Sequence, residues 1–129
     1  MTFDYTIQSK YSFETTIHRL TESLKSVGFG VLWKMDLKEK LQSNSLEFQD
    51  EFQILEICNP VEAHRVLLQD IRAGYFLPCK MLVYTKDKSV YVGMPKPTAL
   101  IEMTNNDELT QIARDIESRL KAAMNRIQL

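Results

Sequence analysis

A short apolar strand that runs directly into a helix constrains this chain more than any other segment. Residues 52–58 form a run of branched and aromatic side chains that is typical of a strand. Asn59 can cap the first turn of a helix and Pro60 suits its first position, while Glu62 can reach back to complete a capping box. The sequence therefore predicts a strand–helix junction at Asn59.

The helix after this junction is predicted to bury one face. Ala63, Leu67 and Ile71 recur at a spacing of four, and Val66 lies beside them. Residues at this spacing share one side of a helix, so these four are expected to face the core. The polar residues between them are expected in water: Arg65, Gln69 and Asp70.

The start of the same helix gathers residues with chemical potential. Free amide groups and the positive end of the helix dipole stabilise an anion or a thiolate. Cys58 precedes the cap, Asn59 forms it, His64 begins the second turn, and Cys79 joins them if its strand starts at the same edge of the sheet. These four are the candidate ligand-binding residues.

Two chemistries are open for these residues, besides a purely structural role. Cys58, His64 and Cys79 could hold a metal, although they are one ligand short of a closed zinc site and would form an open site or one completed across a dimer. Cys58 and Cys79 could form a reversible disulfide if their Cα atoms lie within about 7 Å. Alternatively, both cysteines are buried core residues, as free cysteines often are.

Alternating patterns predict four further strands. They cover residues 3–7, 29–35, 80–85 and 90–94, and the last two form a hairpin. Along the junction strand, Glu56 shares a face with Cys58. Three aromatic residues on the strands are expected in the core or along a ligand pocket: Trp33, Tyr84 and Tyr91.

Helical spacing predicts three more helices. They cover residues 13–27, a short segment at 37–41, and a last helix whose apolar stripe lies within residues 109–127. Thr104 and Asp107 match the capping pattern of this last helix. The element order is thus β-α-β-(short α)-β-α-β-β-α. This order predicts an α+β, two-layer fold, with a five-stranded, largely antiparallel sheet and helices packed on one face.

The junction also carries a family resemblance. Cys58-Asn59-Pro60, Ala63, Gly74, Leu77-Pro78-Cys79 and Val83-Tyr84, in this order, resemble the signature of the prokaryotic family known as domain of unknown function 302. The family's usual proline near Ile71 is absent, and residues 43–47 resemble a small insertion. The resemblance implies a two-layer fold like that of the TATA-box-binding-protein group, and a homodimer. It does not imply nucleic-acid binding, because a fold is not a site.

Composition bounds the class of protein. At 129 residues, with 44% hydrophobic and 26% charged residues, the chain is expected to form a single domain, residues 1–129. The net charge of −1 and the scattered basic residues argue against binding to nucleic acid. We expect a cytoplasmic protein that does not bind membranes, because no signal peptide or apolar span is evident.

Three functions agree with these observations. The first is a homodimeric binding or thiol-redox module that uses the cysteine and histidine site for a metal, a cofactor or a reversible disulfide. The second is an interaction domain without chemistry of its own. The third is an enzyme that holds a small anionic substrate at Asn59. The sequence offers no convincing general base for it beyond Glu56 or His64, so enzyme activity is uncertain and is not favoured. The sequence does not identify a cofactor.

Overall fold

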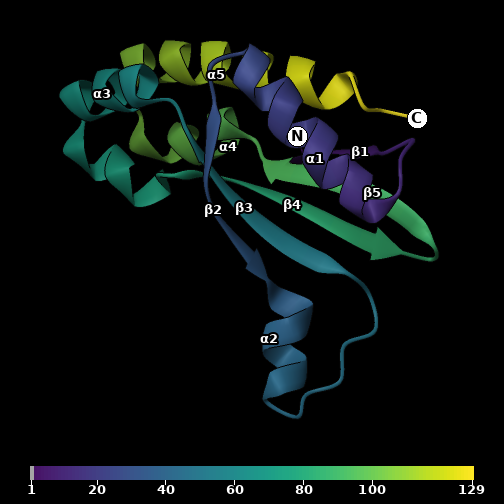
Figure 1. Cartoon of the computed structure of the whole chain (residues 1–129). Coiled ribbons are helices and arrows are strands. Elements are labelled where there is room, and N and C mark those ends of the chain that lie inside the picture. The colour runs from purple at the N-terminus through teal and green to yellow at the C-terminus, as the bar shows by residue number, and fades with distance from the viewer. Residues whose placement is uncertain (1) are drawn as a thin grey trace.

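Five antiparallel strands form one sheet, with strand order β1-β5-β4-β3-β2 (Figure 1). The computed structural model describes residues 2–129. In chain order the strands are β1 (Asp4–Gln8), β2 (Gly30–Asp36), β3 (Phe52–Cys58), β4 (Cys79–Lys86) and β5 (Ser89–Pro95). The predicted α+β architecture and the antiparallel sheet are confirmed.

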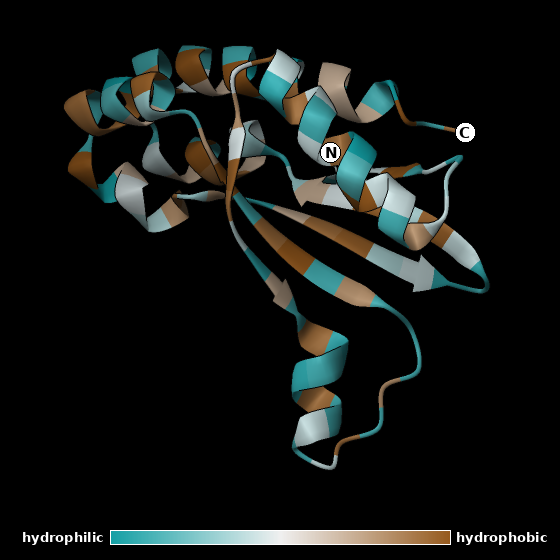
Figure 2. Ribbon diagram, in the orientation of Figure 1, coloured by the Kyte–Doolittle hydropathy of each residue, from teal (hydrophilic) through white to brown (hydrophobic). Residues whose placement is uncertain are grey.

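Three long helices cover one face of this sheet (Figure 1). They are α1 (Phe13–Ser26), α3 (Pro60–Gln69) and α5 (Asp107–Asn125). The hydrophobic core lies between these helices and the sheet, and the predicted stripe of α5 is buried in it. Figure 2 shows the alternation of hydrophobic and hydrophilic residues along α1 and α5, as expected for helices with one buried side.

The other helical segments are short. A 3₁₀ helix, η1 (Ile71–Phe76), follows α3, and α4 (Pro97–Ile101) with the 3₁₀ helix η2 (Glu102–Thr104) connects β5 to α5. The helix α2 (Leu37–Ser43) projects below the sheet (Figure 1). The short helix α4 was not predicted, although Pro97 occupies a first-turn position that suits proline.

Most predicted helix starts are confirmed, but two capping details are wrong. The side chains of Ser12, Asp36 and Asn59 each accept a backbone N–H of the helix that follows. The last helix is capped by Asn106, whose Oδ1 accepts from Leu109 N at 3.0 Å, and not by Thr104. Glu62 does not close a capping box, because arginine side chains hold its carboxylate instead.

The predicted buried face of α3 is confirmed for Val66 but is wrong for Leu67 and Ile71. Val66 and Glu62 are the buried residues of this helix, whereas Leu67 is 36% exposed and Ile71 is 76% exposed. The helix ends at Gln69, and the backbone of Asp70 turns to an extended conformation with φ −159°. Ile71 therefore lies in η1, off the line that a continued helix would follow.

The alternation of side chains between the two faces of the sheet is interrupted in β2. The register with β3 shifts between Val31 and Trp33, so Val31 lies opposite Ile57 while Trp33 lies opposite Glu56. Such a bulge moves the following residues to the other side of the sheet. Trp33 and Met35 consequently lie on the face away from the core, which the simple alternation did not predict.

Two glycines sit where a side chain would collide. A Cβ atom at Gly93 would lie 2.9 Å from Thr6 Oγ1, so the absence of a side chain leaves room for the threonine of the neighbouring strand β1. Gly28 ends the α1 segment with φ +89°, and a Cβ there would lie 2.9 Å from Asn59 Nδ2. The α1–β2 turn is thus packed directly against the start of α3.

Candidate functional site

The two cysteines meet at one edge of the sheet, as the sequence predicted. Cys79 begins β4 opposite Ile57, the residue before Cys58 at the end of β3. Both cysteines are free and partly buried. Consecutive strand residues point to opposite faces, so Cys79, aligned with Ile57, shares the core side. Cys58 follows Ile57 at the end of β3, and both cysteines line the same small cavity beside Asn59. A reversible disulfide between them stays a prediction.

Burial makes the Cys79 thiol a weak acid. It raises the pKa of Cys79 from 9.0 to about 11, and the nearby Cys58 contributes a smaller increase. Cys79 is therefore a neutral thiol at pH 7. In this state it is a small, polarisable lining group and not a nucleophile.

His64 lies on the exposed side of α3. Among residues 2–129, no three His, Cys, Asp or Glu side chains are close enough to hold a metal ion. Cys58, His64 and Cys79 therefore do not form a metal-binding group within one chain. A site completed across a dimer stays a prediction.

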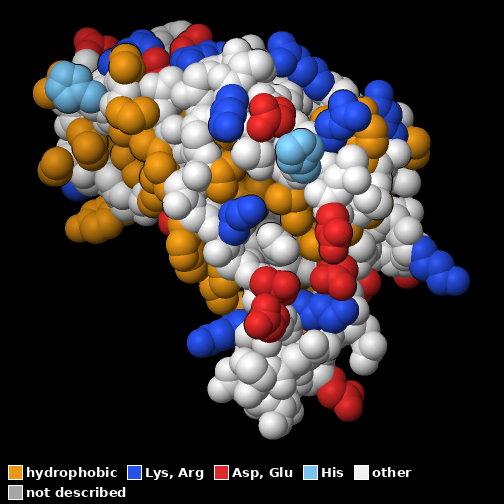
Figure 3. All heavy atoms as spheres, in the orientation of Figure 1, with side chains coloured by type: hydrophobic (Ala, Val, Ile, Leu, Met, Phe, Trp, Pro, Cys, Tyr) orange, Lys and Arg blue, Asp and Glu red, His pale blue; other side chains and the backbone are white. Residues whose placement is uncertain are grey.

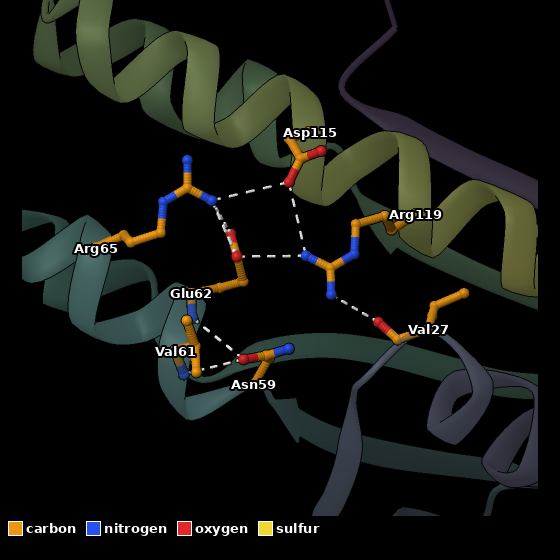
Figure 4. Close-up of polar contacts among 7 residues, drawn as sticks. All are labelled: Val27, Asn59, Val61, Glu62, Arg65, Asp115 and Arg119. Carbon is orange, nitrogen blue, oxygen red and sulfur yellow. Dashed lines mark hydrogen bonds and ion pairs between the residues drawn. The ribbon is translucent and has the colours of Figure 1, made fainter.

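The start of α3 is occupied by the protein's own groups (Figure 4). Asn59 Oδ1 accepts from Val61 N at 2.9 Å and from Glu62 N at 3.2 Å. The cavity beside Asn59 measures only about 10 Å³, about the minimum for one water molecule. This helix start therefore offers an anionic substrate neither free amides at the cap nor room.

Glu62 is the centre of a polar network that joins α3 to α5 (Figure 4). Its buried carboxylate lies 2.8 Å from Arg65 Nη1 and 3.4 Å from Arg119 Nη1. The Arg119 guanidinium also donates to the carbonyl of Val27 at 2.7 Å, and Asp115 contacts both arginines. Every charge in this network has a partner, so we interpret it as a structural lock between helices and not as a binding site.

A large cavity opens beside Cys79, where two adjacent strands separate. The ladder between β4 and β5 stops at Leu82 and Gly93. Before Leu82, β4 pairs only with β3, and after Gly93, β5 pairs only with β1. The separation leaves a cavity of about 380 Å³ that reaches up to α5.

The lining of this cavity is mainly apolar, with charged groups at its opening. Met94, Ala113 and Leu120 are buried lining residues. Lys80 is exposed and the neighbouring Glu56 is half-buried, so they mark where the cavity meets solvent. Glu56 thus lies at a candidate site, as the sequence suggested, but the cavity extends away from Asn59 and His64.

The sequence predicted Cys79 as a site residue but not the cavity around it. Pro95, the last residue of β5, and Pro97 both line this cavity, and neither can donate to a strand ladder. These two prolines are the signal in the sequence that could have indicated the cavity. The lost pairing in fact creates the space beside β4.

The fold and the site describe a small two-layer α+β protein with a mainly apolar cavity between two inner strands of its sheet, β4 and β5. A crystal structure of an uncharacterised conserved DUF302 protein from Bacillus stearothermophilus has the same fold, with a TM-score of 0.97 and 48% sequence identity. The similarity covers 99% of this chain and 100% of that one.

The family model of DUF302, a domain of unknown function, matches residues 5–127, and the chain therefore belongs to the DUF302 family. This result confirms the resemblance carried by the junction motifs. No curated protein matches the chain. Within residues 2–129, no helix combines the length and the apolar character needed to span a bilayer.

Proposed function

We propose that this protein is a binding module that holds a small, largely apolar molecule in the cavity between β4 and β5. The cavity volume of about 380 Å³ is the observation that carries the proposal. Ligand pockets measure roughly 300–1,000 Å³ and are lined mainly by apolar side chains. This cavity has both properties, and it opens to solvent beside Lys80 and Glu56, so a small molecule can enter it.

The ends of the cavity suggest how such a molecule is oriented. The inner wall, with Met94 and Leu120, offers only van der Waals contacts. At the opening, Lys80 and Glu56 lie opposite each other on adjacent strands and can contact a polar end of the ligand. A neutral Cys79 thiol between these regions adds a soft contact without charge.

A thiol-redox role is the second candidate, supported by the adjacent positions of Cys58 and Cys79. The raised pKa of Cys79 argues against rapid thiol exchange at neutral pH, because the thiolate is the attacking species. A metal or another cofactor at Cys58, His64 and Cys79 would need ligands from a second chain. We therefore place both below the cavity proposal.

Filling the cavity tests the proposal, because it should increase the stability of the protein and abolish the binding of a small apolar molecule. Ala113 is buried in α5 and lines the cavity, so Ala113→Leu places three more carbon atoms in it. We expect the variant to be about 1 kcal/mol more stable than the wild type, as cavity-filling substitutions commonly are. Indole, used as an apolar probe, should raise the unfolding temperature of the wild type and leave that of the variant unchanged.

The control is Ala122→Leu, at an exposed position on the same helix. It should keep the response to indole. If the wild type shows no response to indole, or if Ala113→Leu responds as the wild type does, the cavity is not the binding site.

A further inference from the structure

The opening of the cavity between β4 and β5 carries two charges of opposite sign. Among the described residues that line the cavity, Glu56 and Lys80 are the charged ones. They are register partners on β3 and β4, so their side chains leave the sheet on the same face, with Cβ atoms roughly 5 Å apart. A ligand whose apolar part fills the cavity would therefore meet an anion and a cation side by side at the opening.

The protein itself does not use these two charges. Within residues 2–129, the ion pairs include neither Glu56 nor Lys80, although the two lie on neighbouring strands. Other carboxylates are held firmly: two arginines bind Glu62, and Lys121 lies 3.2 Å from Glu117. Both charges at the opening are therefore available to the polar groups of a ligand.

An aromatic ring lies beside the negative charge. The register places Trp33 on β2 directly opposite Glu56, on the face away from the core. Trp33 is 50% exposed, and the π face of an indole ring attracts cations. A carboxylate next to an indole ring suits an ammonium group, whereas Lys80, on the other side of Glu56, suits a carboxylate.

The interior of the cavity has room for an aromatic ring or a branched chain. An apolar cavity of about 150 Å³ is enough to hold benzene, and this cavity measures about 380 Å³. Its wall reaches the molecular surface at Tyr75, which is 88% exposed. Figure 3 shows hydrophobic side chains around α3 and further along the side of the sheet towards α2, so apolar surface is not confined to the cavity. A ligand with one apolar end and one charged end fits this arrangement.

We propose that the ligand is an α-amino acid with an apolar side chain. Its ammonium group lies between Glu56 and Trp33, its carboxylate binds Lys80, and its side chain enters the cavity. This assignment rests on the proposed function, because it needs the cavity to be a binding site, and it adds the chemical class of the ligand. An α-amino acid carries both charges at neutral pH, attached to one carbon atom. A ligand with a single charge would leave either Glu56 or Lys80 without a partner.

Three matched aromatic compounds test the two polar contacts. L-Phenylalanine has both charges, phenethylamine lacks the carboxylate, and hydrocinnamate lacks the ammonium group. Calorimetric titration of the wild type at neutral pH should give an affinity for L-phenylalanine roughly tenfold higher than for either analogue, as expected for one lost charged contact. None of the three contains an indole ring, so Trp33, the single tryptophan, reports on the bound ammonium group. Its emission should change with L-phenylalanine and phenethylamine, and less with hydrocinnamate.

Substitutions assign each contact. Glu56→Gln should make the affinities for L-phenylalanine and hydrocinnamate about equal, and Lys80→Met should do the same for L-phenylalanine and phenethylamine. The control is Lys86→Met, which removes the same charge at the exposed far end of β4, outside the cavity. It should keep the preference of the wild type for L-phenylalanine.

The outcomes separate this inference from the proposed function. Binding of indole without any preference for L-phenylalanine would overturn the inference alone and leave the cavity as the binding site. A preference that survives both Glu56→Gln and Lys80→Met would also overturn it. If neither indole nor L-phenylalanine binds to the wild type, the proposed function fails as well.

Discussion

Replacing Glu62 with glutamine is expected to lower the free energy of unfolding by about 2–3 kcal/mol. The carboxylate is only 7% exposed and bridges Arg65 and Arg119. Glutamine keeps the size of the side chain but removes its charge, which leaves both guanidinium groups without their main partner. The value lies below that of a fully buried pair, because Arg65 and Arg119 keep 46% and 31% of their side-chain surface.

The same network contains a matched control. Asp115 contacts both arginines at 3.9 and 3.6 Å, but its side chain is 54% exposed. Asp115→Asn should therefore cost less than about 1 kcal/mol, as exposed ion pairs do. Urea unfolding of the two variants measures the difference. Equal losses of unfolding free energy in the two variants would show that the burial of Glu62 does not determine how much this network stabilises the protein.

Stability is expected to fall by about 2–3 kcal/mol between pH 9 and pH 11 because of Cys79 alone. In the unfolded chain the thiol ionises near its ordinary pKa of 9.0, whereas in the folded protein its pKa is about 11. Below pH 9 both states are protonated and the thiol has no effect. As the pH rises above 9 the unfolded state loses its proton first, which favours unfolding, and the effect is complete above pH 11.

Comparison with variants isolates this contribution from the lysines and tyrosines that titrate in the same range. Cys79→Ala should remove the extra loss of stability between pH 9 and pH 11. Cys58→Ala should reduce it only slightly, since burial is the larger cause of the shift. Denaturant unfolding at several pH values provides the measurement. Parallel pH profiles for the wild type and Cys79→Ala would contradict the assigned pKa.

The sequence predicted correctly those parts of the fold that depend on residues close together in the chain, such as helix starts. The β3 strand ends at Cys58 and α3 begins at Pro60 because Asn59 caps the helix, as predicted. The buried apolar residues of α5 were predicted correctly, because a helix of 19 residues is long enough to repeat its apolar pattern several times. The antiparallel sheet followed from the order of these elements.

The features that the sequence did not predict depend on contacts between residues far apart in the chain or on where a strand or helix ends. Leu67 and Ile71 have helical spacing, but α3 stops before Ile71. Glu62 matched a capping box, but Arg119, far away in the chain, competes for its carboxylate. The cavity depends on where β4 and β5 lose their pairing, and the side of the sheet on which Trp33 lies depends on a bulge in β2. Neither feature has a local signature.

The sequence predicted correctly that Cys58 and Cys79 lie close together, but the structure gives this region a different role. Cys58 and Cys79 do lie at one edge, while His64 points to solvent on α3 and Asn59 is used by its own helix. What distinguishes this edge is the space beside Cys79. The motif residues therefore build the wall of a pocket in our account, with Pro78 and Cys79 at its side.

The most direct test of this account is a titration of isotopically labelled protein with indole, followed by amide chemical shifts. The account predicts saturable shifts that cluster at Cys79, Lys80, Met94 and Ala113, around the opening between β4 and β5. Ala113→Leu should abolish them. Shifts confined to residues outside the cavity, such as Leu82 and Tyr84, or no saturable shifts at all, would contradict the claim that the cavity is a binding site.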